Sequence, residues 1–443
     1  MKTRLETLAA TFLLTALTII FFSACSMLMP PPPLVPASAQ GDAGMVKTLI
    51  AQGADINASD AKGQTPLLAA ICNGKAETAR QLVSAGADVN IGITHDLECG
   101  KNTLYKGSTA LMAALTNHED ALALMLLENG ADITVVDSNG AGPLILAAIG
   151  GSPETIRAVI QKKANINAVV KKDFECKENP MFVGFTPLMC ALQLKRTQNA
   201  KTLMDGGADI NVQCKNGINA IIIAAYKGES KAVKELLEKG ADPKSALTMD
   251  FTVKGRPVFK GANALMAAAD SGDTKSVSAL VKAGAEVDAG DENGATPLMA
   301  AAAKGNLKAV KLLVSFGADV NEATEKTFKI GPDPIPEGTS VLSIAAFGGH
   351  PETVRFLIEK GADVNAKDKD FAMNPLFLAS YNGHYEAAKV LIENGADVFA
   401  FSHMGTALNA AHHGRYNELV RLIEDARKKV LAEANGQAKT SGE

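Results

Sequence analysis

The tripeptide Gly-Ala-Asp recurs along the chain at nearly regular intervals, and this repetition limits the possible folds more than any other feature. With Gly240, where Pro follows the tripeptide in place of Ile or Val, and with related triplets that begin at Lys163 and Gly284, the intervals alternate between 33 and 44 residues, except for a final interval of 34. This period indicates one structural unit per repeat, stacked on its neighbours, so the 443 residues need no second globular core. The other triplets begin at Gly53, Gly86, Gly130, Gly207, Gly317, Gly361 and Gly395.

Each repeat also contains a triplet similar to Thr-Pro-Leu, which predicts the start of a helix. Thr, Ser or Asn stands first in nine of the ten triplets and can cap a helix, and Pro in second place loses only an N–H that would have no helical partner. In the repeat from Asn57 to Val89 we expect helices from about Pro66 to Asn73 and from about Glu77 to Ala85. The triplets begin at Thr65, Thr109, Gly142, Thr186, Asn219, Asn263, Thr296, Ser340, Asn374 and Thr406.

Two helices this short cannot bury their apolar faces alone, but a stack of such pairs can. From about Gly41 to Leu422 the pattern of paired helices with intervening hairpin turns resembles the ankyrin repeat. The resemblance implies an all-α ankyrin-repeat solenoid with projecting β-hairpins, and it implies binding to another protein. One departure is that residues such as Leu68 and Met112 replace the His that usually follows Thr-Pro-Leu.

The pattern sets the limits of the repeat domain at residues 41–434. Residues Gly41 to Ile56 supply only a second helix, so we predict a half repeat followed by ten complete repeats. The last helix continues from Asn417 through a charged segment that can cover the end of the stack, and residues 435–443 are expected to fray. Lys163 stands where Gly usually ends the second helix, so we expect a left-handed conformation there at a cost of about 1 kcal/mol.

Every second repeat carries 11 extra residues before its first helix, which creates a longer period of 77 residues. We name these four segments finger 1 (residues 91–108), finger 2 (168–185), finger 3 (245–262) and finger 4 (322–339). In each finger, apolar positions flank a turn-rich centre, and this pattern predicts a β-hairpin. The apolar positions that recur every 77 residues include Leu97, Phe174, Phe251 and Phe328 on one side of the centre and Leu104, Met181, Val258 and Ile335 on the other.

The fingers are the first candidate for a protein-binding surface, because rigid aromatic side chains and Arg often carry binding energy. An alternative is that the finger aromatics pack locally and form a small core, since an isolated hairpin is only marginally stable in water. The candidates are the outer aromatics Tyr105, Phe182 and Phe259, the tip residues Lys101, Lys177 and Arg256, and the inner aromatics Phe174, Phe251 and Phe328.

A second candidate surface lies near the ends of the first helices, at Ile149, Tyr226, Phe347 and Tyr381. In ankyrin-repeat proteins this region lines the concave groove. The alternative is that these side chains merely cover neighbouring helix turns, because single exposed apolar residues are common on protein surfaces.

The N-terminus has the pattern of a secretory signal. Lys2 and Arg4 precede an apolar run of residues 8–22, which is short for a membrane span. The following Phe22-Ser23-Ala24-Cys25 resembles a bacterial lipobox, which implies a signal peptide at residues 1–24 and a lipid on Cys25. Residues 25–40 contain a Pro-rich run and are expected to form an extended tether. An uncleaved anchor through Met29 and cleavage after residues 37–39 are the alternatives.

Composition argues against several classes of function. A net charge of -4 and 5% aromatic residues offer little for nucleic-acid binding. We found no phosphate-binding loop, metalloprotease motif or nucleophile elbow, so we expect no enzyme, no metal or other cofactor and no small-molecule substrate. Besides Cys25 the chain has five cysteines, and Cys176 with Cys214, on adjacent hairpins, is the one pair that we expect to be sterically reasonable.

These features together predict a monomeric, non-enzymatic protein-interaction module that is held at a bacterial membrane by an N-terminal lipid and faces the periplasm. One alternative is a scaffold that stabilises or protects an exported enzyme. The other is an enzyme with an unrecognised site, which would require a convergent polar pocket.

Overall fold

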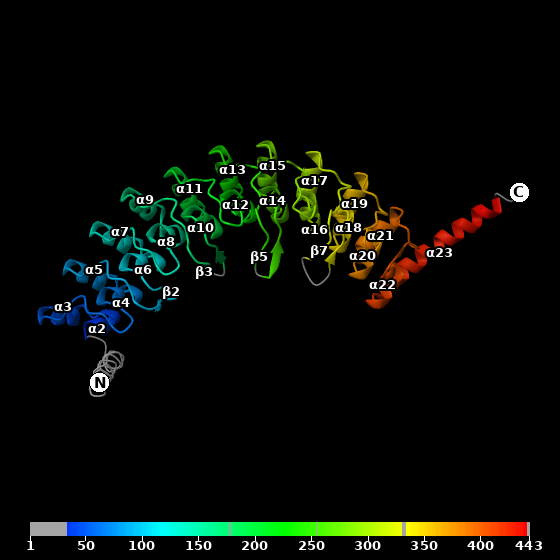
Figure 1. Ribbon diagram of the computed structural model, residues 1–443. Coiled ribbons are helices and arrows are strands. Elements are labelled where there is room, and N and C mark those ends of the chain that lie inside the picture. The colour runs from blue at the N-terminus through cyan, green and yellow to red at the C-terminus, as the bar shows by residue number, and fades with distance from the viewer. Residues whose placement is uncertain (1–32, 177–178, 254, 330–333, 441–443) are drawn as a thin grey trace, which may run out of the picture. The chain divides into compact units, whose positions relative to one another are not determined.

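The computed structural model describes residues 33–176, 179–253, 255–329 and 334–440. Its 22 helices in these ranges form eleven consecutive helix pairs, each joined by a short loop. The chain divides into two compact units, one that ends at Asp209 and one that begins at Ile210. Within each unit the helices form two layers, with even-numbered helices in one and odd-numbered helices in the other (Figure 1). The predicted stack of helix pairs is therefore present in both units.

The first unit contains five helix pairs. They are α2 (Leu34–Gln40) with α3 (Ala43–Ala51), α4 (Pro66–Cys72) with α5 (Ala76–Ser84), α6 (Ala110–Thr116) with α7 (Asp120–Glu128), α8 (Pro143–Gly150) with α9 (Pro153–Gln161), and α10 (Pro187–Gln193) with α11 (Thr197–Asp205).

The second unit contains six pairs. They are α12 (Ala220–Tyr226) with α13 (Ser230–Glu238), α14 (Ala264–Ser271) with α15 (Thr274–Lys282), α16 (Pro297–Ala303) with α17 (Leu307–Ser315), α18 (Val341–Phe347) with α19 (Pro351–Glu359), α20 (Pro375–Tyr381) with α21 (Tyr385–Glu393), and α22 (Ala407–His413) with α23 (Asn417–Thr440).

The even-numbered helices begin where the Thr-Pro-Leu-like triplets predict. In helix α4, the Thr65 hydroxyl accepts a hydrogen bond from the Leu68 N–H, and every residue of the helix is buried. Among the described residues, eight of the ten triplets have a first side chain that caps its helix in this way. Local capping thus fixes where each buried helix starts, and packing of its apolar side chains against the next pair stabilises it.

The first repeat is complete, so the predicted half repeat and the extended conformation of residues 34–40 are wrong. Helix α2 occupies these residues and buries Leu34 and Val35 next to helix α4. Pro36 is compatible with this helix because it is the third helical residue, where an N–H has no acceptor within the helix. The proposed signal, the lipobox and Cys25 lie outside the described residues.

The C-terminal end also differs from the prediction. We expected the chain to fray from residue 435, but helix α23 continues to Thr440, so this prediction is wrong for residues 435–440. A short hairpin of β9 (Phe401–Ser402) and β10 (Gly405–Thr406) precedes helix α22 in the last repeat. This hairpin was not predicted from the sequence.

All four fingers form the predicted hairpins. In each one, the two recurring apolar positions face one another across the antiparallel pair, as Leu97 faces Leu104 in finger 1. The strands are β1 (Leu97–Cys99) and β2 (Asn102–Leu104), β3 (Phe174–Cys176) and β4 (Asn179–Met181), β5 (Phe251–Val253) and β6 (Arg256–Val258), and β7 (Phe328–Lys329) and β8 (Pro334–Ile335).

The predicted left-handed conformation of Lys163 is confirmed, with a φ of 68°. His118, Lys195 and Arg415, which lie in loops between the two helices of a pair, also have positive φ angles. In the described residues, no helix has both the length and the apolar character needed to cross a membrane.

Candidate functional site

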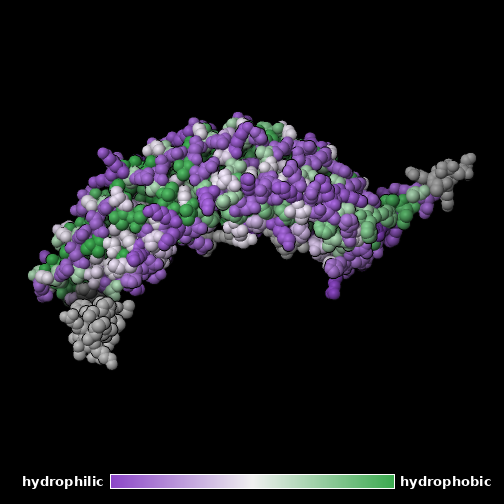
Figure 2. Space-filling model, in the orientation of Figure 1, coloured by the Kyte–Doolittle hydropathy of each residue, from purple (hydrophilic) through white to green (hydrophobic). Residues whose placement is uncertain are grey.

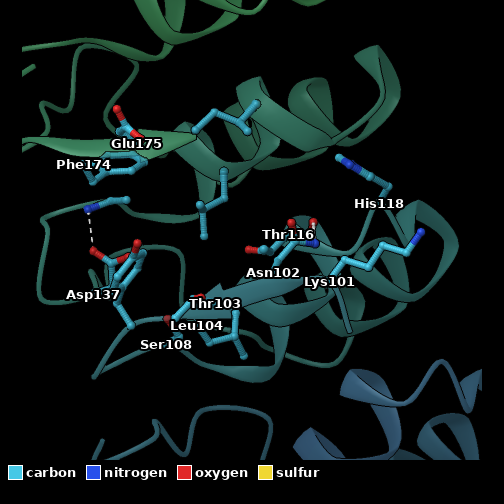
Figure 3. Close-up of a pocket in the computed structure, with 14 residues that line it drawn as sticks. Lys101, Asn102, Thr103, Leu104, Ser108, Thr116, His118, Asp137, Phe174 and Glu175 are labelled. Carbon is cyan, nitrogen blue, oxygen red and sulfur yellow. Dashed lines mark hydrogen bonds between the residues drawn. The ribbon is translucent and has the colours of Figure 1, made fainter. Parts of the chain in front are cut away.

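A groove in the first unit lies between finger 1 and finger 2, and we call it the finger groove. Residues 101–105 of finger 1 line one side, and Phe174 and Glu175 of finger 2 line the opposite side (Figure 3). Leu146 and Ile149 of helix α8 also line it, and its volume is about 220 Å³. The groove therefore combines an apolar wall with charged residues at its rim.

Finger 1 is fixed by a disulfide bond that was not predicted from the sequence. The bond joins Cys72, the last residue of helix α4, to Cys99, the last residue of strand β1, with a Cα–Cα distance of 4.4 Å. The prediction that Cys176 and Cys214 are the one sterically reasonable pair is therefore wrong. Only distances between cysteines on different hairpins were considered for that prediction, whereas Cys99 of finger 1 lies against the end of helix α4. The side chain of Cys176 lies outside the described residues.

Hydrogen bonds hold the other strand of finger 1. The Asn102 Nδ2 group donates to the Thr116 carbonyl at 3.1 Å and to the Asn117 side-chain oxygen at 3.2 Å. Asn117 also donates to the Cys99 Sγ atom at 3.3 Å. Finger 1 is thus attached to the C-terminal ends of both α4 and α6, so one wall of the finger groove is preorganised.

Two predicted site residues meet across the groove. The rings of Tyr105 and Phe174 lie 6.4 Å apart in an edge-to-face arrangement, and both side chains are half-buried. Lys101, a third predicted residue, is exposed at the tip of finger 1. Three residues singled out from the sequence are therefore brought together in one groove.

The other finger aromatics also pack against rings. Phe182 contacts Phe185 at 5.5 Å, and Phe259 contacts Phe328 of the next finger at 5.3 Å. Phe328 is buried and Phe251 is half-buried, while Arg256 is exposed at the tip of finger 3. Lys177 lies outside the described residues. Local packing thus accounts for much of the aromatic surface of the fingers, and a role in binding stays a prediction for these residues.

Asp137 is the most deeply buried acidic group beside the finger groove. Its carboxylate accepts hydrogen bonds from the backbone N–H groups of Asn139 and Ala141 at 2.8 and 2.9 Å. Burial nevertheless raises the pKa of Asp137 above its ordinary value, because removal of water penalises the charged form more than these bonds favour it. The bonds stabilise a turn between α7 and α8, so we assign Asp137 a structural role.

The second predicted surface is only partly exposed: Ile149, in the first unit, is buried, and the other three residues lie in the second unit. Tyr226 is the last residue of helix α12 and 57% exposed, and Phe347 is the last residue of helix α18 and 40% exposed. Tyr381 occupies the same place in helix α20, but it is half-buried and stacks on Phe377 at 6.3 Å. Tyr226 and Phe347 are therefore more accessible than the described aromatic residues of the fingers.

An apolar surface on the last repeat was not predicted. Phe401 is 67% exposed, Met404 is 54% exposed, and the Arg427 guanidinium lies 5.0 Å from the ring centre of Phe399. Hydrophobic side chains are also visible on helix α23 in Figure 2. A signal was available in the sequence, because Phe399 stands where the preceding repeat has Asn365, whose side chain bonds to the Gly395 carbonyl of the following repeat.

The comparison with protein families decides the fold family. A model for "Ankyrin repeats (3 copies)" matches seven overlapping segments of the chain. The segments are residues 34–137, 91–172, 122–214, 169–246, 221–324, 325–402 and 342–434. The chain belongs to the ankyrin-repeat family. Its fold is the predicted all-α ankyrin-repeat solenoid with hairpins lengthened in alternate repeats.

Individual relatives match only parts of the chain. It is 31% identical over 88 residues to the Ankyrin repeat and SAM domain-containing protein 6 of Rattus norvegicus, a match that spans 20% of this chain and 9% of the rat protein. The crystal structure of the human ASB11 ankyrin repeat domain matches with a TM-score of 0.45 and 23% identity, and covers 54% of this chain and 98% of that one. We draw no functional conclusion from either relative.

Ankyrin repeats indicate a module for protein–protein interaction, which is the general function we assign. In the described ranges of this ankyrin-repeat chain, no group of three or more His, Cys, Asp or Glu side chains is placed to hold a metal ion. The candidate surfaces offer aromatic area, hydrogen-bonding groups and a few charges, which suit recognition of a polypeptide.

Proposed function

We propose that this protein is a non-enzymatic recognition module that binds another protein in the bacterial periplasm and is anchored to a membrane by a lipid on Cys25. The observation that carries the binding proposal is the exposure of Tyr226 and Phe347 at equivalent helix ends in the second unit. Large aromatic side chains on a rigid scaffold lose little conformational entropy when they bind. Such residues often dominate binding energy.

Replacement of both residues by Ala in the full-length protein tests this proposal. Wild-type and variant proteins are used to capture proteins from a membrane fraction, and bound proteins are quantified by mass spectrometry. We expect the double variant to capture at least tenfold less of one specific partner, because exposed aromatic residues often dominate binding energy. The fold should stay intact, because exposed side chains contribute little to folding. A Met45→Ala variant, which also removes an exposed apolar side chain but lies outside the candidate surfaces, is the control and should retain the partner. Equal capture by all three proteins would contradict the assignment.

The disulfide supports export, because such bonds form and persist in oxidising compartments such as the periplasm. The lipobox-like sequence before Cys25 supports a lipid anchor. In cells, Cys25→Ser should release the protein from the membrane fraction or leave its signal uncleaved, and the N-terminal peptide of the wild type should carry a lipid mass. A wild-type N-terminus that begins after Ala39, or that retains Met1, would contradict the lipid anchor and select one of the alternatives.

A further inference from the structure

Strand β2 of finger 1 has an open edge at Thr103. The hairpin loop is two residues long, so Cys99 and Asn102 beside it exchange hydrogen bonds with each other. The next pair, Glu98 and Thr103, then points its backbone N–H and C=O groups away from the partner strand. Thr103 therefore presents one donor and one acceptor at the edge of β2.

The other three fingers have Pro at the position equivalent to Thr103. Pro180 faces Glu175, Pro257 faces Thr252, and Pro334 faces Lys329. Since Pro has no N–H, it fits a paired strand only where the backbone points outward, which independently supports the orientation of Thr103. Pro at an exposed edge also prevents the addition of another strand. Among the four fingers, finger 1 alone keeps a backbone donor at this position.

The open edge borders a cavity. Thr103 lines the finger groove and its side chain is exposed, while Phe174 and Glu175 of finger 2 lie on the opposite side (Figure 3). Apolar side chains of Tyr105, Leu146 and Ile149 line the space beside the strand. Charged groups stand at its rim, a Lys101 ammonium on finger 1 and a Glu175 carboxylate on finger 2.

We propose that the finger groove binds an extended segment of the partner protein, which adds to strand β2 as a third strand. The Thr103 N–H and C=O pair with the backbone of this segment, and an apolar side chain of the segment contacts Leu146 and Ile149. The segment carries charged residues on both sides of the apolar one, complementary to Lys101 and Glu175. The proposal rests on the proposed function, because it specifies the form in which the partner is recognised.

Finger 1 is suited to this mode of binding because both of its strands are held in place. The disulfide fixes β1 at Cys99, and Asn102 attaches β2 to the end of helix α6. A strand that is already ordered loses little entropy when a peptide pairs with it. Finger 1 has Thr103 where the other three fingers have a Pro that blocks the strand edge, and Thr103 lines the finger groove.

The experiment uses the full-length, oxidised protein and a phage-displayed library of random 12-residue peptides as the probe. Enriched peptides are synthesised, and their Kd values are measured by fluorescence anisotropy with wild type, Thr103→Pro and Thr103→Ala. We expect Thr103→Pro to weaken binding at least tenfold, since it removes the edge donor, and Thr103→Ala to change the Kd less than threefold, since it keeps the backbone. The three natural Pro fingers show that Pro fits this position, and circular dichroism melts check that the variant folds.

A second measurement does not depend on mutating the protein. Backbone N-methylation of a bound peptide at single successive positions should weaken binding strongly at one position, because only the peptide N–H that donates to the Thr103 carbonyl pairs with strand β2. No enriched peptide, equal binding to Thr103→Pro, or an equal effect of N-methylation at every position would each overturn the proposal. The proposed function fails separately, through equal partner capture by the Tyr226 and Phe347 double variant.

Discussion

The disulfide between Cys72 and Cys99 connects the end of helix α4 to the end of strand β1 across 27 positions of sequence. Both cysteines are buried, so the bond fastens finger 1 to the interior of the repeat that precedes it. In fingers 3 and 4 the position equivalent to Cys99 is Val253 or Ile330, which cannot form such a bond. Finger 1 is therefore held by a covalent link that these later fingers lack.

Loss of this disulfide should destabilise finger 1 and the helices attached to it. A disulfide that closes a loop of this length reduces the conformational entropy of the unfolded chain and so raises the free energy of the unfolded state by about 3 kcal/mol. The double variant Cys72→Ala, Cys99→Ala should therefore lose about 3 kcal/mol of local stability, measured as faster hydrogen exchange of amides in strands β1 and β2.

Finger 3 serves as an internal control for this prediction, because its exchange should not change in the same variant. A reducing agent should accelerate exchange in finger 1 of the wild type and have no effect there in the double variant. Identical exchange of finger 1 in the wild type and the double variant would show that the bond does not stabilise the finger.

The sequence predicts the fold well wherever the signal is local. Thr65 and the equivalent residues cap their helices through contacts within one turn, so the helix starts are visible in the sequence. Leu34 and Val35 were misassigned because the neighbouring Pro residues favour an extended chain, while packing against α4, which no local pattern reveals, makes them helical.

The candidate sites depend on contacts that sequence spacing does not determine. The recurrence of Phe259 and Phe328 predicts hairpin positions, but it does not show that the two rings touch across neighbouring fingers. Likewise, the stacking distance between repeats could not show that Cys99 returns to Cys72. Tyr226 was identified correctly as a residue at a helix end, and its exposure follows from the packing around it.

Lys163→Gly should stabilise the first unit by about 1 kcal/mol. Lys163 has a φ of 68°. This conformation is unfavourable for a residue with a β-carbon, whereas Gly adopts it at almost no energetic cost. Urea unfolding monitored by circular dichroism measures the gain. Lys162→Gly is the matched control, because the φ of Lys162 is -74° and Gly relieves no strain there. An equal or greater gain from the control would contradict the explanation.

Asp137→Asn should change how stability depends on pH. Burial raises the pKa of Asp137 above 3.8, so the folded state binds its proton more tightly than the unfolded state does. The contribution of Asp137 to stability is therefore greatest at low pH and falls as pH rises from 3.8 through the folded pKa. The stability of Asp137→Asn relative to wild type should rise over that interval, measured by urea unfolding at several pH values.

Asp137→Ala is the control for the hydrogen bonds of the same residue. Asn keeps an oxygen that can accept from the N–H groups of Asn139 and Ala141, whereas Ala leaves both without this acceptor. Relative to Asp137→Asn, which also lacks the titrating carboxyl group, the Ala variant should lose about 1–3 kcal/mol at every pH. A constant difference between wild type and Asp137→Asn across the pH range would rule out the raised pKa.

The contact between Phe259 and Phe328 should couple fingers 3 and 4 energetically. Their rings lie 5.3 Å apart at 79°, an edge-to-face geometry, and Phe328 is buried. Single Ala variants should each destabilise the second unit, and a double-mutant cycle should give a coupling of about 0.5–1.5 kcal/mol. The same cycle with Phe259 and Phe401, which lies on the hairpin of the last repeat, should be additive. Coupling near zero for Phe259 and Phe328 would contradict an energetic role for this ring contact.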